Sequence, residues 1–185
     1  MAKKYMKEST LIEPLFFDTD CICAFLWVNE QTLLPALYPG RLILPKPVYT
    51  EISKVVHLKT AVDTMISKMQ LILEEIQIGS EEYSIYYLLA IKPEPGCKLI
   101  GKGEAASIAL AKVRSGILAS NNLKDVMTYV QEYGLNHITT GKIMMEALTQ
   151  GLITEEHGNT IWQAMINKRR KLGANTFSEF LTNQK

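Results

Sequence analysis

Three acidic residues lie where the sequence changes from one predicted element to the next. Asp18 directly follows a short apolar run at residues 15–17, Glu51 falls early in a predicted helix, and Glu104 falls in the first turn of another. Because ligands of open parallel sheets bind at the carboxyl ends of the strands, we expect these carboxylates to share one sheet edge. Carboxylate oxygens bind hard divalent cations such as Mg²⁺. A metal ion at such an edge indicates phosphodiester chemistry.

A fourth strand end carries polar residues without an acid. The strand predicted at residues 117–120 ends in Ser120-Asn121-Asn122, where a further carboxylate would be expected. The amide oxygen of Asn122 can bind Mg²⁺ but adds no charge, so we expect weaker metal binding than with four carboxylates. Asn121 is an alternative amide at the same edge. Ser120 either hydrogen-bonds a ligand or phosphate, or simply ends the strand.

Each acidic residue also has a purely structural explanation. Asp is favoured as a helix N-cap, which applies to Asp18 and Asp20. Glu in a first helical turn interacts favourably with the helix dipole, which applies to Glu51 and Glu104. Asp20 therefore either adds a carboxylate to the edge or begins a helix. Asp125, one turn into the next predicted helix, either reaches the edge or is a solvent-exposed acid.

The elements that would position these residues alternate between short apolar strands and helices. This alternation predicts a mainly parallel central sheet flanked by helices on both faces, a three-layer α/β fold. After residue 140 the pattern becomes entirely helical, so we divide the chain into an α/β domain, 1–140, and a helical extension, 141–185, packed on the same domain. The predicted strands are residues 15–17, 42–44, 71–78, 117–120 and 137–139.

The composition is that of an ordinary globular domain. The chain has 185 residues, of which 47% are hydrophobic and 21% charged, and its net charge of +1 does not indicate a strongly basic nucleic-acid-binding protein. No segment approaches the roughly 18 apolar residues that cross a bilayer, and no signal peptide is evident. The three cysteines have no framework spacing. We therefore expect a cytoplasmic protein without a membrane partner.

One local basic run stands out against the near-neutral total charge. Residues 168–171 read Lys-Arg-Arg-Lys and follow Trp162 in the last part of the chain. Such a run either complements the dipole at a solvated helix end or contacts a nucleic-acid backbone. The sequence leaves both explanations open.

Four motifs, taken in order, resemble those of the PIN-domain family. They are Phe17-Asp18-Thr19-Asp20, the Glu51 helix, Gly103-Glu104-Ala105-Ala106, and the strand end Ala119-Ser120-Asn121-Asn122. That family includes VapC-type toxin ribonucleases, and the resemblance covers roughly residues 14–140. It implies that Asp18, Glu51 and Glu104 are catalytic and, with Asn122, bind metal. The fourth motif usually reads Thr, any residue, Asp, so Ser120 replaces the Thr and Asn122 replaces the Asp.

The resemblance implies a function as well as a fold. It predicts a Mg²⁺- or Mn²⁺-dependent endoribonuclease that hydrolyses RNA phosphodiester bonds. By analogy with VapC-type toxins, the expected partners are RNA, an inhibitory antitoxin protein and a second copy of the chain in a homodimer. The alternative, motivated by Asn122, is a catalytically impaired PIN fold that binds RNA or protein without cutting.

Overall fold

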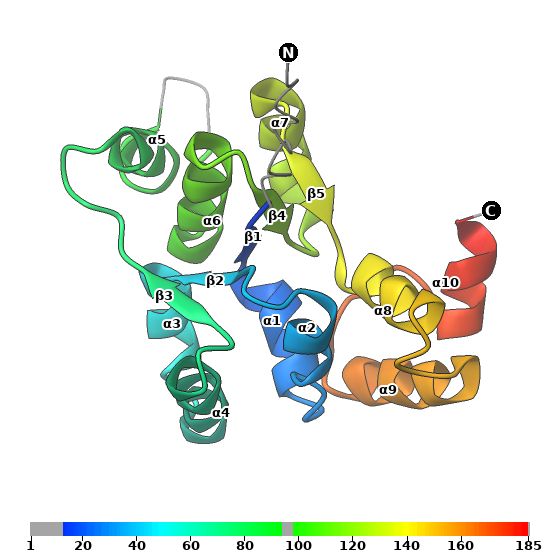
Figure 1. Ribbon diagram of the computed structural model, residues 1–185. Coiled ribbons are helices and arrows are strands. Elements are labelled where there is room, and N and C mark those ends of the chain that lie inside the picture. Colours follow the sequence, from blue (N-terminus) through cyan, green and yellow to red (C-terminus); the bar gives the residue numbers. More distant parts are fainter. Residues whose placement is uncertain (1–12, 94–97, 185) are drawn as a thin grey trace, which may run out of the picture.

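The computed structural model describes residues 13–93 and 98–184, apart from the side chains of Leu123 and Asp125. Cys97 therefore lies outside the described residues. Within them, the strands form a parallel sheet in the order β3-β2-β1-β4-β5 (Figure 1). The strands are β1 (Leu15–Phe17), β2 (Leu42–Pro45), β3 (Ile72–Glu74), β4 (Ile117–Ala119) and β5 (Asn136–Ile138).

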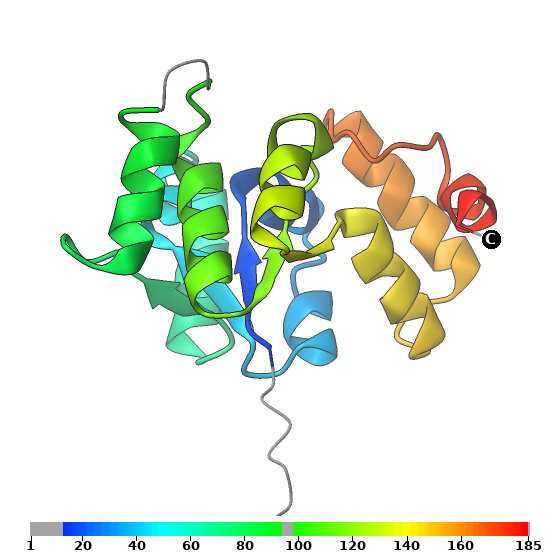
Figure 2. The same ribbon diagram turned by 90° about the horizontal axis from the view of Figure 1, so that it is seen from above.

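Helices cover both faces of the sheet. Figure 2 shows α5, α6 and α7 side by side in one layer, whereas α1 to α4 lie behind the sheet in this view. The helices are α1 (Thr19–Leu26), α2 (Leu33–Leu37), α3 (Lys46–Ile52), α4 (Val56–Ser67), α5 (Glu81–Ala90), α6 (Lys102–Val113), α7 (Leu123–Tyr133), α8 (Thr140–Thr149), α9 (Glu155–Asn167) and α10 (Phe177–Asn183).

The central strand separates two apolar cores. All three residues of β1 are fully buried, but Phe16 belongs to the core under α5, α6 and α7, while Leu15 and Phe17 belong to the other core. Successive side chains of a strand point to opposite faces, so a strand buried on both faces reads as a continuous apolar run. The predicted three-layer α/β fold is therefore confirmed.

The strand order places a ligand-binding edge at a defined point. The chain moves outward from β1 to β2 and β3, then returns to β4 on the other side of β1. Such a reversal opens a crevice at the carboxyl ends of the strands. Phe17 pairs with Ala119 in the register of β1 and β4, so Asp18 and Ser120 leave the sheet next to each other.

The strand predicted at residues 71–78 is shorter than expected. Only Ile72–Glu74 pairs with β2, and Ile78 is largely exposed. The last pair joins Glu74 to Pro45, after which the chain of β2 enters α3. In the part of the chain that the structure describes, residues after Glu74 therefore have no neighbouring strand to pair with, although their apolar pattern suggested one.

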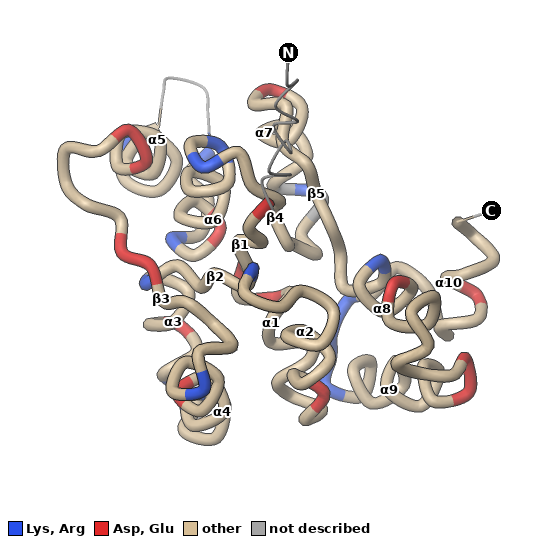
Figure 3. The backbone as a smooth tube through the Cα atoms, in the orientation of Figure 1, with Lys and Arg blue, Asp and Glu red and all other residues tan. Residues whose placement is uncertain are grey.

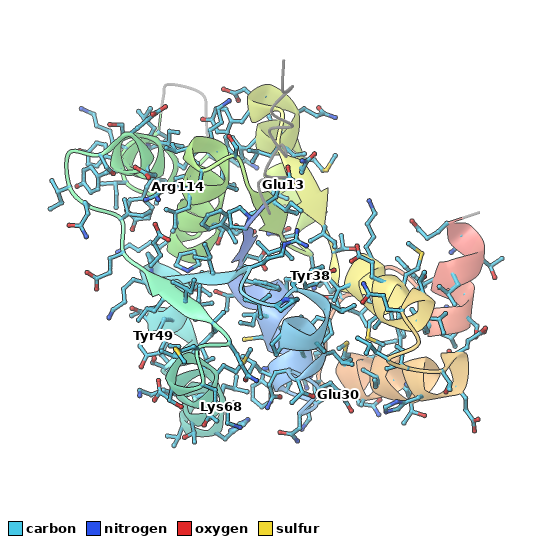
Figure 4. The ribbon with its side chains drawn as sticks, viewed as in Figure 1. Glu13, Glu30, Tyr38, Tyr49, Lys68 and Arg114 are labelled. Carbon is cyan, nitrogen blue, oxygen red and sulfur yellow. The ribbon has the colours of Figure 1, made fainter. Side chains whose placement is uncertain are left out.

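The helices that follow β5 pack against the α/β part. Trp162 of α9 is completely buried, contacts Phe177 and Phe180 of α10, and donates a 3.1 Å hydrogen bond from Nε1 to the Ala174 carbonyl. Its core is continuous with that of α1. Tyr38, beside α2, donates a 2.6 Å hydrogen bond to Glu146 of α8 (Figure 4). No described helix has the length and apolarity needed to cross a membrane.

Candidate active site

Asp18 lies at the carboxyl end of the central strand and caps the next helix. Its backbone is extended, its Oδ1 accepts a 2.7 Å hydrogen bond from the Cys21 amide, and its own amide donates to the Ala119 carbonyl. The predicted capping role therefore belongs to Asp18 rather than to Asp20. The residue is only 1% exposed. A buried carboxylate is costly unless charge or hydrogen bonds compensate it, so capping alone does not account for its burial.

Burial raises the pKa of the Asp18 carboxyl to about 7. The Ser120 side chain and the Cys21 amide oppose this by hydrogen bonding to the charged form, whereas the nearby charges of Asp20 and Glu104 raise the pKa further. Among the described residues, no Lys, Arg or His forms an ion pair with Asp18. At neutral pH this carboxyl is therefore partly protonated, and a cation bound beside it would displace the proton.

Glu51 joins the beginnings of two helices. Its Oε2 accepts a 2.5 Å hydrogen bond from the Thr19 hydroxyl, and its Oε1 accepts a 3.2 Å bond from the Gly103 amide. Thr19 follows Asp18, and Gly103 precedes Glu104. Glu51 therefore fixes the first turn of α1 against the first turn of α6, and with it the relative positions of the other two acids.

Gly103 makes this arrangement sterically feasible. A Cβ atom at this position would lie 3.0 Å from the Thr19 hydroxyl oxygen and 3.2 Å from each carboxylate oxygen of Glu51. These approaches are closer than ordinary van der Waals contact, so a side chain here would push the carboxylate away. The glycine of the third motif thus has a packing reason: it lets Glu51 reach a backbone amide.

The amide of Asn122 contacts the carboxylate of Glu104. Its Nδ2 donates a 2.7 Å hydrogen bond to Glu104 Oε1. A carboxylate at position 122 could not donate this bond and would face another carboxylate instead. Asn122 therefore replaces a repulsion between acids with an attraction when no cation is bound.

The side chains of Ser120 and Asn121 both form hydrogen bonds with other residues of the protein. Ser120 is fully buried, and its hydroxyl oxygen accepts a 3.2 Å hydrogen bond from the Asn122 amide, while its side chain also bonds to Asp18. The Asn121 side chain forms two bonds with Thr140, donating to its hydroxyl at 2.8 Å and accepting from its amide at 2.9 Å. Ser120 therefore orients Asp18, and Asn121 attaches the end of β4 to α8.

Three residues that were not predicted to belong to the site hold this edge together. Thr19 binds Glu51, and Thr140 binds Asn121. Ser107 is buried in α6, and its hydroxyl lies 2.9 Å from the Phe17 carbonyl and 3.0 Å from that of Gly103. It ties α6 to the end of β1. As the one polar residue in the apolar run 105–111, Ser107 carried a signal that could have identified it.

The remaining acids lie at the margin of the edge. Asp20 is exposed and pairs with Arg170 at 3.3 Å, and the side chain of Asp125 lies outside the described residues. In the described part of the chain, no group of three or more His, Cys, Asp or Glu is arranged to hold a metal ion. The donors at the edge are oxygens of carboxylates, hydroxyl and amide, the chemistry that suits Mg²⁺ or Mn²⁺. By this criterion the residues of the edge fit such an ion.

Basic side chains lie beside the acids. A cavity of about 440 Å³ is lined by Asp20, Asn121, Asn122, Lys124 and the basic residues 169–171. Figure 3 shows this run as a blue segment between α1 and α8. The run follows the end of α9 and leads into α10, so it forms a linker rather than part of a helix. The acidic edge is therefore bordered by positive charge.

A parallel sheet with a buried acid at the carboxyl edge of its switch point defines a doubly wound α/β fold with a candidate ligand site at that edge. The sequence profile of the PIN-domain family matches residues 15–185, so the chain belongs to this family. The match continues through the C-terminal helices. No curated protein and no solved structure gave a significant match.

Proposed function

We propose that the protein is a Mg²⁺- or Mn²⁺-dependent endoribonuclease and that its active site is the edge formed by Asp18, Glu51, Glu104 and Asn122. The observation that carries the proposal is the burial of Asp18 at the end of the central strand, beside Glu104 and, within residues 13–93 and 98–184, without a cationic side chain paired to it. A bound divalent cation would compensate this charge.

The residues of the edge would have different roles in catalysis. Asp18 and Glu104 would hold the cation with the help of the Asn122 amide oxygen. Ser120 orients Asp18, and Glu51 fixes the relative positions of Asp18 and Glu104. The cation would supply an activated water and would stabilise charge on the attacked phosphate. Lysine and arginine side chains of the neighbouring cavity would attract the RNA backbone.

The two cysteines among the described residues offer no competing nucleophile. Cys21 and Cys23 are buried in α1, and burial raises the pKa of the Cys23 thiol to about 12. Burial likewise raises the pKa of Cys21 well above its ordinary value. Because the thiolate is the reactive form, neither residue is suited to attack a phosphate at neutral pH. This supports water as the nucleophile.

A cleavage assay on RNA with Mn²⁺ tests the proposal. Glu104→Gln keeps an oxygen acceptor for Asn122 but removes a charge, and we expect it to lower the cleavage rate about 100-fold or more, as does removal of an electrostatic group from an active site. Glu156→Gln is the matched control, because Glu156 is an exposed acid in the first turn of α9. Cleavage that survives both Glu104→Gln and EDTA would contradict the proposal.

A second function, binding without cleavage, is favoured by the hydrogen bond between Asn122 and Glu104. This bond satisfies a carboxylate oxygen that would otherwise be directed to a metal ion. Calorimetric titration with Mn²⁺ distinguishes the two functions. Binding of RNA without any heat of metal binding at millimolar concentration would identify a non-catalytic module.

The physiological role that we propose follows the analogy with VapC-type toxins. In that role the protein cleaves RNA in the cytoplasm as a homodimer and is inhibited by an antitoxin protein. Light scattering measures the oligomeric state, and growth arrest after expression of wild type but not Glu104→Gln tests the toxin role. Growth that is unaffected by the wild-type protein would argue against it.

A further inference from the structure

A second and larger cavity lies between the α/β part and the C-terminal helices. We call it the junction pocket; its volume is about 680 Å³, within the range of about 300–1,000 Å³ typical of small-molecule sites. Its lining comes from the end of β4, from β5, α7 and α8, and from residues 171–173 and α10. It shares Asn121, Asn122, Lys124 and Lys171 with the cavity beside the acids. The junction pocket is therefore contiguous with the candidate active site.

Apolar side chains form one part of the lining. Met127 of α7, Leu172 of the linker and Phe180 of α10 contribute them. The Phe180 ring is held in place, because it packs 5.2 Å from the Trp162 ring and would overlap a Cβ atom at Gly141. Phe180 nevertheless stays half-buried, and Met127 is 37% exposed. The pocket thus presents a fixed aromatic ring and flexible apolar surface to solvent.

Positively charged and neutral polar side chains form the rest of the lining of the junction pocket. Lys124, Lys142 and Lys171 are exposed, and the described lining contains no acid. The Nε2 of His137 lies 2.9 Å from the Ser120 carbonyl, which can only accept, so this nitrogen carries the proton. Burial lowers the pKa of His137, which keeps its ring neutral near pH 7. The pocket therefore combines two aromatic rings with lysines that attract phosphate.

We propose that the junction pocket binds one unpaired base of an RNA strand whose adjoining phosphate lies at the acidic edge. Aromatic rings stack on the faces of bases, and lysines neutralise the phosphates on either side. The exposed amides of Asn183 and Gln184 suit the polar edge of a base. A base within a duplex could not enter, so the C-terminal helices would select single-stranded RNA. The identity of the ligand rests on the proposed function.

Binding measured without metal tests the pocket separately from cleavage. Fluorescence anisotropy in EDTA would compare a labelled ten-nucleotide RNA with versions that carry one abasic site at each position in turn. We expect one abasic position to weaken binding to the wild type about 5- to 100-fold, the range for loss of one stacked base. Equal binding of intact and abasic RNA at every position would overturn the proposal.

Variants of the pocket show where that base binds. Met127→Ala and Phe180→Leu should both reduce the penalty of the abasic site, whereas Met69→Ala, a matched change at an exposed position outside the pocket, should leave it unchanged. Thermal unfolding verifies that each variant is folded. If Phe180→Leu does not fold, the result for Met127→Ala decides the test. A penalty that stays the same in Met127→Ala would place the base elsewhere and overturn the proposal.

Charge reversal tests the role of the lysines. Lys171→Glu should weaken binding of the intact RNA, while Lys68→Glu, at the end of α4 (Figure 4), should leave it nearly unchanged. Equal weakening by both changes would show a general effect of charge and contradict the pocket. If the protein binds RNA with base selectivity but does not cleave it, the proposed nuclease function is contradicted and the base-binding pocket is supported. If it cleaves RNA but shows no base selectivity, the base-binding pocket is contradicted and the nuclease function is supported.

Discussion

The side-chain amide of Asn122 donates a 2.7 Å hydrogen bond to a carboxylate oxygen of Glu104. The two residues come from different elements, since Asn122 directly precedes α7 and Glu104 lies in the first turn of α6, and they meet at the carboxyl edge of the sheet. An acid at position 122 would bring two negative charges together there. The natural residue thus stabilises the metal-free edge and reduces the charge available to a cation.

The first prediction concerns Asn122→Asp. Loss of the hydrogen bond and the new repulsion should lower the free energy of unfolding by about 1–3 kcal/mol in EDTA. Mn²⁺ should then raise the melting temperature of the variant more than that of the wild type, because the added carboxylate strengthens metal binding. Thermal unfolding with and without Mn²⁺ measures both effects, and Asn29→Asp, at an exposed position, is the control. An identical metal response in variant and wild type would count against a metal site at this edge.

The second prediction concerns pH and Asp18. Its pKa is about 7 in the folded protein against an ordinary value of 3.8, so the folded state binds more protons than the unfolded state between these values. The contribution of the Asp18 carboxyl to the free energy of unfolding is therefore fully present below about pH 4 and is lost as the pH rises through 7. The shift corresponds to roughly 4 kcal/mol.

Asp18→Asn should remove this loss, because a neutral amide keeps the cap without a charge. Melting temperatures measured from pH 4.5 to 8 should fall more steeply in the wild type than in the variant. Mn²⁺ should stabilise the wild type more at pH 8 than at pH 5, since binding must displace the proton. A wild type that gains stability relative to the variant as the pH rises would refute this account of Asp18.

The third prediction concerns Gly103→Ala. Alanine favours a helix by about 1 kcal/mol over glycine, but the added methyl group would crowd Thr19 and both oxygens of Glu51. We expect displacement of Glu51 to outweigh the helix preference, with a net loss of about 1–2 kcal/mol in urea unfolding. Gly101→Ala, which brings its methyl group only into ordinary contact with Glu104, should cost less. A Gly103→Ala protein more stable than the wild type would show that the contact is easily relieved.

The fourth prediction concerns the packing of the C-terminal helices. A Cβ atom at Gly158 would lie 2.4 Å from the ring of Phe177, which is fully buried. Gly158→Ala should therefore destabilise the protein by about 1–3 kcal/mol, despite the better helix former. Chemical denaturation checks this, with Thr160→Ala at an exposed position of the same helix as the control. A change in stability no larger than that of Thr160→Ala would mean that α10 shifts at little cost.

The sequence by itself determined the layers of the fold and the place of Asp18. Alternating strands and helices, and a cap such as Asp18, depend on residues a few positions apart, so they can be read from local patterns. The run 15–17 is apolar throughout because its strand is buried on both faces. Local pattern failed at residues 76–78, where strand formation depended on a distant neighbour.

Only the tertiary structure decided how the edge is built. The bond between Glu51 and Gly103 spans 52 positions and that between Ser107 and Phe17 spans 90, and each depends on the register of β1 with β4 and on the packing of α6. The contact between Asn122 and Glu104 has the same origin. Sequence motifs specify which residues reach the edge, whereas helix rotation and strand register determine which atoms face each other. The difference is physical, since hydrogen bonds require an accuracy of tenths of an ångström that local patterns do not encode.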